Sequence, residues 1–169
     1  ITFDEMKGVD YSDKKWDKFV SQLTKSEMAE LIAMGNFQTV AVERLGIPKT
    51  LLFDGPAAIK DTYRSDKGCL LYPAECSAGA TWSKEIMHEF GCSAGDDAVQ
   101  CGVTGWYAPG VNLHLNAFTA RGFEYFSECP VLSGKLAAAE SKGAESNGLI
   151  VIVKHLVDGV DKAVNEQAL

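Results

Sequence analysis

A chain of 169 residues, of which 46% are hydrophobic, is long enough for one domain with a substantial core. Its formal net charge of −7 argues against nucleic acid and anionic membranes as partners, because both repel an acidic protein. A complete eightfold α/β barrel usually needs about 250 residues, so this chain is too short to form one.

The cysteines and histidines indicate neither a metal site nor a disulfide framework. The five cysteines are odd in number and none has the spacing of a zinc site, although one disulfide among them stays open. Mostly free thiols favour a reducing compartment or an anaerobic source, and they slightly favour the cytoplasm without fixing the localisation. The three histidines are not closely spaced, so we expect no metal and no cofactor. No apolar run approaches the roughly 18 residues of a membrane span, and no signal peptide is visible.

The first part of the chain predicts a charged lead-in arm over residues 1–22, followed by helices. Thr24 is an N-cap with Glu27 three residues later, which is the pattern of a capping box. The helical apolar pattern then stops at Gly35–Asn36. A short second helix is expected over residues 38–45.

The remainder, residues 23–169, predicts half of a barrel domain in which four strands alternate with helices. A helix is expected from Ser83 to about residue 95 with a second piece over 96–101, and another from Pro130 to Asn147–Gly148. The predicted strands are 50–53, 78–81, 103–108 and 149–153. A half barrel leaves strand edges unpaired, so we expect it to need a second half, in cis or in trans.

Polar residues follow several of these strands at the edge where parallel α/β proteins bind ligands. Asp54 ends the first predicted strand within Asp-Gly-Pro. Residues 105–130 begin with a short apolar run, which is followed by a long loop rich in polar and aromatic residues. Lys154 and His155 end an aliphatic strand, where an unpaired buried charge would be costly, so we expect them to point into a polar site.

These segments resemble glycoside hydrolase family 3, the β-glucosidase and exo-glucanase family. The resemblance rests on GWYAPGVNLHLNAFTARGFEYFSECPVLSGKLAAA, on residues 53–57 (FDGPA) and on residues 153–155 (VKH), which occur in the family's order. It covers roughly residues 16–158, and residues 35–56 are most similar to the subgroup whose two domains occur in reversed order. The implied fold is a partial (β/α)8 TIM barrel, about the first four strand–helix units.

The resemblance implies a part of an enzyme that hydrolyses terminal β-D-glucosyl residues by a retaining mechanism, acting on a β-glucoside or short β-glucan. It implies that Asp54, Arg121, Lys154 and His155 bind the sugar, and that Glu124 orients Arg121 or Lys154. The family takes its nucleophile from a later barrel strand and its acid/base from a second domain. Neither of these two segments is found within the 169 residues. We therefore assign no catalytic residue and expect the isolated chain to be inactive.

Several positions depart from the family pattern. The family usually has Arg, Asn, Asp and Phe where this chain has Leu115, Gly122, Cys129 and Leu156. Each change removes a polar group or a ring near the expected sugar site. We expect the fold to survive these changes, whereas sugar affinity and catalytic competence are in question.

Other interpretations of the same residues remain open. Asp54 is also suited to capping its own turn, Arg121 to lying in solvent and Lys154 to pairing with Asp158. The chain as a whole could be a non-catalytic half barrel that binds sugar or assembles with a partner chain. An unrelated barrel enzyme with Lys154 as a Schiff-base amine fits the surrounding motifs less well.

Overall fold

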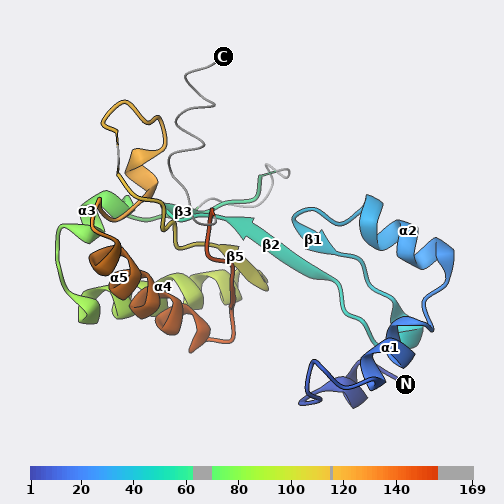
Figure 1. Cartoon of the computed structure of the whole chain (residues 1–169). Helices are drawn as coiled ribbons and strands as arrows, with labels where there is room; N and C mark the ends of the chain where they lie inside the picture. Colours follow the sequence, from blue (N-terminus) through green and yellow to red (C-terminus); the bar gives the residue numbers. More distant parts are fainter. Residues whose placement is uncertain (63–69, 115, 156–169) are drawn as a thin grey trace. The chain divides into compact units, whose positions relative to one another are not determined.

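The computed structural model describes residues 1–62, 70–114 and 116–155 (Figure 1). The chain divides into two compact units, Ile1–Leu51 and Leu52–Leu169. The finer expectation of an arm over 1–22 and a half barrel over 23–169 stays a prediction.

The first unit is built around a small apolar core of Met6, Phe19, Val42 and Leu45. The predicted capping box is confirmed: Thr24 Oγ1 accepts a hydrogen bond from Glu27 N at 3.2 Å, and Glu27 Oε2 accepts one from Thr24 N at 2.7 Å. The elements in chain order are the 3-10 helix η1 (Asp4–Met6), α1 (Lys15–Val20), α2 (Lys25–Ala33), β1 (Gln38–Thr39) and the 3-10 helix η2 (Glu43–Leu45).

The predicted helix over residues 38–45 is wrong except for the short 3-10 helix η2 at its end. Gln38 and Thr39 instead pair antiparallel with Leu51 and Thr50 at the start of β2 (Thr50–Asp54). The hydroxyl groups of Thr39 and Thr50 lie 2.7 Å apart across this pair. β-Branched residues such as these favour strands over helices, and a cross-strand threonine pair adds to that preference.

The second unit contains three parallel strands in the order β2, β5 (Gly105–Tyr107) and β6 (Ile150–Val151). Phe53 is in register with Trp106, which is in register with Val151. Three of the four predicted strands are therefore confirmed, and their carboxyl ends lie at one edge of the sheet. The α/β class and the partial barrel architecture agree with this arrangement.

The predicted strand over residues 78–81 is wrong, because residues Glu75–Gly79 form the short helix α3. Ala78, Gly79 and Ala80 lack the β-branched and aromatic side chains that are typical of strands. Consequently β5 pairs directly with β2. Between β2 and α3 in chain order, β3 (Ala58–Ile59) and β4 (Leu70–Leu71) form a separate antiparallel pair.

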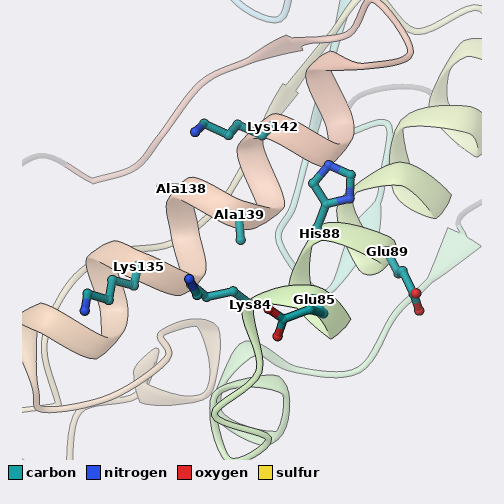
Figure 2. A pocket seen from close by; sticks show the side chains of 8 residues that line it. All are labelled: Lys84, Glu85, His88, Glu89, Lys135, Ala138, Ala139 and Lys142. Atoms are coloured by element: carbon teal, nitrogen blue, oxygen red, sulfur yellow. The ribbon is translucent and has the colours of Figure 1, made fainter.

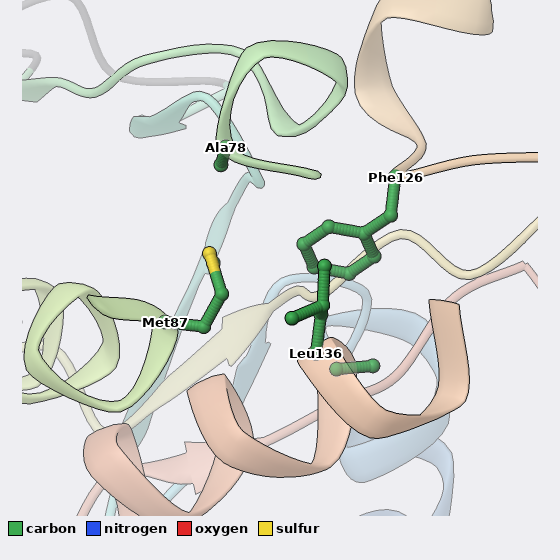
Figure 3. Close-up of a cluster of buried hydrophobic side chains, with 5 residues drawn as sticks. Ala78, Met87, Phe126 and Leu136 are labelled. Carbon is green, nitrogen blue, oxygen red and sulfur yellow. The ribbon is translucent and has the colours of Figure 1, made fainter. Parts of the chain in front are cut away.

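Helices α4 (Lys84–Gln100) and α5 (Pro130–Glu145) lie side by side along the sheet (Figure 1). α4 is one continuous helix rather than the two expected pieces, since the fully buried Ala94 and Ala98 extend its inner face past residue 95. Figure 3 shows Met87 of α4 and Leu136 of α5 meeting Ala78 and Phe126 in the core of this unit. None of the helices described is long and apolar enough to cross a membrane.

The contact between α4 and α5 depends on a close approach at Gly91. A Cβ atom at this position would lie 2.0 Å from the backbone oxygen of Glu140 and 3.0 Å from the nitrogen of Ala144. Because both are backbone atoms, they can make room only if the helices separate. The approach of the two helices therefore requires glycine at position 91.

We predict that Gly91→Ala lowers the free energy of unfolding of the chain by about 1–3 kcal/mol, the usual cost of overpacking a core. Gly134→Ala is the matched control, because a Cβ at this helical position meets nothing within 4 Å. Since alanine favours helix over glycine, the control should gain about 0.5–1 kcal/mol. Urea unfolding measures both, and equal stability of Gly91→Ala and the wild type would contradict this close packing of α4 on α5.

Candidate functional site

Five polar residues from separate parts of the second unit meet at the carboxyl ends of the parallel strands. Asp54 is the last residue of β2, and Lys154 and His155 follow β6. Arg121 precedes and Glu124 ends the 3-10 helix η3 (Gly122–Glu124) in the long loop after β5. We refer to Asp54, Arg121, Glu124, Lys154 and His155 as the polar cluster.

Lys154 is the buried cation of the polar cluster, with a side chain that is only 8% exposed. Its Nζ donates to Asp54 Oδ1 at 3.0 Å and also to the carbonyl oxygen of Gly55. Glu124 Oε2 lies 3.5 Å from the same Nζ. Two carboxylates thus compensate one ammonium group, which a buried charge requires.

Glu124 also binds Arg121 through two parallel hydrogen bonds. Arg121 Nε donates to Oε1 at 3.0 Å, and Nη2 donates to Oε2 at 2.6 Å. This bidentate pairing raises the pKa of the Arg121 guanidinium. Glu124 therefore contacts both cations that the sequence had assigned to it as alternatives.

The contacts of His155 define its tautomer. Arg121 Nη2 lies 2.7 Å from His155 Nε2, and because a guanidinium only donates, Nε2 must accept. The ring proton is then on Nδ1, which lies 3.2 Å from the hydroxyl of Tyr125 and can donate to it. The backbone N–H of His155 donates to Asn112 Oδ1 at 2.9 Å. Tyr125 and Asn112 thus orient His155 from both sides.

All five predicted site residues are therefore brought together in one connected network. The expected approach of Asp54 to Lys154 is confirmed, over a separation of 100 residues in the chain. Arg121 does not lie free in solvent, because it is held by Glu124 and His155. The suggested pairing of Lys154 with Asp158 concerns a residue outside the described ranges, as do the departures at Leu115 and Leu156.

A cleft of about 290 Å³ borders the polar cluster. Asp54 and Glu124 line it, whereas Arg121, Lys154 and His155 do not contribute to its wall. The half-exposed ring of Phe123 forms part of the same wall. The remaining lining residues are Gly55, Pro56, Ala57, Ala58, Lys60 and Leu71. A small hollow with two carboxylates and an aromatic ring can accept hydrogen bonds from a polar ligand and pack against its apolar face.

Sequence reasoning missed a buried carboxyl group beneath this site. Glu75 of α3 is fully buried, and its Oε1 and Oε2 accept hydrogen bonds from Gly110 N at 3.0 and 3.1 Å. A second fully buried carboxyl, Glu140 of α5, is close enough to raise the pKa of Glu75 further beyond the effect of burial. The signal in the sequence was that Glu75 is the only charged residue in the stretch 70–82.

A larger hollow of about 530 Å³ lies on the outer faces of α4 and α5 (Figure 2). Figure 2 shows the side chains that line it, Lys84, Glu85, His88 and Glu89 of α4 and Lys135, Ala138, Ala139 and Lys142 of α5. Its charges are mixed and none of the predicted site residues lines it. We assign it no ligand.

The other candidate ligands in the described ranges do not gather into a metal site. Among residues 1–62, 70–114 and 116–155, no group of three or more His, Cys, Asp or Glu side chains could hold a metal ion. Cys76, Cys92, Cys101 and Cys129 are free thiols. Cys69 lies outside the described ranges.

Comparison with known proteins finds relatives over most of the chain. The family model of the glycosyl hydrolase family 3 N terminal domain matches residues 18–166. Beta-glucosidase A of Butyrivibrio fibrisolvens is 30% identical over 168 residues, which cover 90% of this chain and 20% of that protein. The chain thus spans about a fifth of the length of this relative.

Solved structures share the fold. Beta-glucosidase 3B of Thermotoga neapolitana in complex with glucose superposes with a TM-score of 0.72 and 33% identity, covering 83% of this chain and 23% of that one. The beta-glucosidase of Kluyveromyces marxianus in complex with glucose gives a TM-score of 0.77 and 28% identity, covering 85% of this chain and 18% of that one. In both of these relatives the matching fold is one segment of a longer chain.

We predict that Lys154→Met destabilises the chain by about 1–3 kcal/mol, because it leaves the mostly buried Glu124 and its neighbour Asp54 with one cation fewer. The partial exposure of Asp54 keeps the expected loss below that of a fully buried pair. Lys135→Met, at an exposed lysine of α5, is the control and should leave the urea midpoint nearly unchanged. Equal midpoints for the two variants would show that Lys154 is not a structural cation.

Proposed function

The chain belongs to glycosyl hydrolase family 3, and from this premise we propose that it supplies the sugar-binding part of an enzyme that removes terminal β-D-glucosyl residues with retention of configuration. Its substrate is a β-glucoside or short β-glucan. The observation that supports this best is the Asp54–Lys154 pair at the edge of the cleft, which unites the ends of two parallel strands.

In this proposal Asp54 is the anchor for the sugar. Its Oδ1 is occupied by Lys154 Nζ and by the N–H of Gly55, while Oδ2 makes no hydrogen bond to any residue that the structure describes. A carboxylate fixed through one oxygen presents the other to sugar hydroxyls in a constant direction. Charge-assisted hydrogen bonds of this type are strong and discriminate well between stereoisomers.

Three of the remaining members of the polar cluster are proposed to contact the sugar, and the fourth holds two of them in position. Arg121, Lys154 and His155 are donors that we propose to bind further hydroxyl groups of the same sugar, and Glu124 holds Arg121 and Lys154 in place for this. These three donors do not line the cleft, so we propose that the sugar reaches them across Asp54 and Glu124. Phe123 offers a ring face beside that path.

We further propose that the nucleophile and the acid/base are contributed from outside these residues, by the remaining barrel half and a second domain, in cis or in trans. The short span of the chain relative to its relatives supports this. So do the side chains of Ile150 and Val153 around β6, which are 54% and 52% exposed and are available to pack against a further part of a barrel. Alternatively, the chain is a half barrel that binds sugar without cleaving it.

The test is a chimera in which this chain replaces the matching fifth of Beta-glucosidase A of Butyrivibrio fibrisolvens. We expect the folded chimera to hydrolyse an aryl β-glucoside and the isolated 169-residue chain to show no turnover. Asp54→Asn in the chimera should lower kcat/KM, because the sugar loses its charged anchor. The loss should correspond to about 2–4 kcal/mol of transition-state stabilisation.

Asp96→Asn is the matched control, since Asp96 is an exposed residue of α4 whose side chain accepts a hydrogen bond from Gln100. It should leave kcat/KM unchanged. A chimera that binds glucose but never turns over would favour the non-catalytic alternative. If Asp54→Asn and Asp96→Asn had the same activity, the proposed role of Asp54 would be wrong.

A second prediction concerns Gly122, where the family usually has asparagine. A Cβ at this position meets nothing within 4 Å, so a side chain fits without displacing its neighbours. We expect Gly122→Asn to strengthen glucose binding by the chimera about two- to tenfold, the value of one additional hydrogen bond. Calorimetric titration measures this, with Gly122→Ala as the control that adds volume without a polar group, and equal affinities for the two variants would count against a sugar contact at this position.

A further inference from the structure

The buried carboxyl groups of Glu75 and Glu140 are the feature of the second unit that sugar binding does not explain. Both side chains are fully buried, Glu75 on α3 and Glu140 on α5. Glu140 has no hydrogen-bond partner among the described residues at either oxygen. Two neighbouring carboxyl groups without solvent cannot both be ionised cheaply, so their presence in the core needs a reason.

Glu75 is connected to the polar cluster through a single loop. Its two oxygens hold the N–H of Gly110, and Gly110 forms a parallel bridge with Lys154. On either side of that bridge, Lys154 N donates to Pro109 O at 3.0 Å, and Val111 N donates to Lys154 O at 2.7 Å. The loop that Glu75 holds is thus the strand-like partner of the backbone that carries Lys154.

The same loop reaches His155. Asn112, two residues after Gly110, accepts the backbone N–H of His155 through its side chain. Gly110 itself passes close between two elements: a Cβ there would lie 2.4 Å from the backbone oxygen of Glu124 and 3.2 Å from Glu75 Oε2. A displacement of this backbone away from Glu75 would therefore disturb Glu124, Lys154 and His155 together.

We propose that Glu75 is a positioning residue for the Lys154–His155 end of the polar cluster, and that Glu140 is the proton-bearing neighbour that holds Glu75 in place at neutral pH. The consequence for sugar binding rests on the function proposed above. The positioning itself does not, because it concerns only contacts within this chain.

The environment of the pair indicates that both carboxyl groups bear protons at neutral pH. Burial, and then Glu140, raise the pKa of Glu75 well above its ordinary value, Glu124 adds to this, and the Gly110 N–H and Lys154 offset only part of the rise. Glu140 has no hydrogen-bond partner in the described part of the chain, and burial raises its pKa to about 8. With both protons present, no charge repulsion acts between the two groups, and Glu75 can remain against Gly110.

Raising the pH should remove this arrangement. Burial raises the pKa of Glu140 from 4.5 to about 8, and burial together with Glu140 raises that of Glu75. Between pH 4.5 and about 8, Glu140 of the native chain holds a proton that the same residue has released in the unfolded chain. The free energy of unfolding should therefore fall as the pH rises from 4.5 to about 8. Above this window a buried charge on Glu140 disrupts the packing that keeps Glu75 against Gly110.

The experiment is amide hydrogen exchange of the 169-residue chain, followed by NMR at Gly110 and corrected for the intrinsic rise of exchange with pH. Glu75→Leu removes the acceptor and should reduce the protection of Gly110 about tenfold or more relative to the amides of α4. Glu75→Gln retains an acceptor oxygen and should restore most of that protection. Neither readout depends on sugar, so failure of this test is distinct from failure of the glycosidase proposal.

Glu140→Gln tests the role of the proton on Glu140, and Glu145→Gln, at an exposed position of α5, is its control. In the wild type and the control, Gly110 should lose protection, and the urea midpoint should fall, as the pH rises through about 8. Both dependences should be weaker in Glu140→Gln, because an amide cannot ionise and only Glu75 of the pair can still titrate. If Glu75→Leu fails to fold, this comparison still decides. Identical pH profiles for the two glutamine variants, or unchanged Gly110 protection in Glu75→Leu, would overturn the proposal.

Discussion

A lysine ammonium that is only 8% exposed needs compensating negative charge, and Lys154 obtains it from two carboxylates carried by separate segments of the chain. Asp54 comes from the end of β2 and Glu124 from the loop after β5. Because one cation is shared by both, the strand ends and the loop are held in a common position. Arg121 and His155 extend the same network, so the geometry of the whole polar cluster depends on this ammonium group.

The rest of the second unit brings Lys154 to this place and keeps it there. The parallel pairing of β2, β5 and β6 sets the carboxyl ends at one edge, and the glycine contact between α4 and α5 lets the helices cover the sheet closely. The backbone of Lys154 is paired with the loop at Gly110, which Glu75 holds from below. The sheet, the two helices and the buried carboxyl group of Glu75 thus act together to fix the position of Lys154.

Much of this arrangement could be predicted from the sequence, because it follows from local patterns. The aliphatic run before Lys154 and the Asp-Gly-Pro turn at Asp54 marked two strand ends, and parallel topology then required them to meet. The capping box at Thr24 is a local signal of the same kind. Each of these features is set by residues that are neighbours in the chain.

The errors arose where contacts distant in sequence decide the structure. Residues 78–81 and 38–45 are short and ambiguous, and their conformation depends on partners that periodicity does not reveal, such as Thr50 for Thr39. The role of Glu75 toward Gly110 spans 35 residues and involves a backbone N–H, for which no side-chain pattern exists. The bidentate pairing of Glu124 with Arg121 was within reach of sequence, whereas its simultaneous contact with Lys154 was not.

The central claim is that Lys154 and Asp54 act as one unit in sugar recognition, and a double-mutant cycle tests it most directly. The kcat/KM for an aryl β-glucoside is measured for the chimera, for Asp54→Asn, for Lys154→Met and for the double variant. If the two residues form one unit, the double variant is about as active as Asp54→Asn alone. If the two losses simply add, Lys154 and Asp54 act independently and the claim is contradicted.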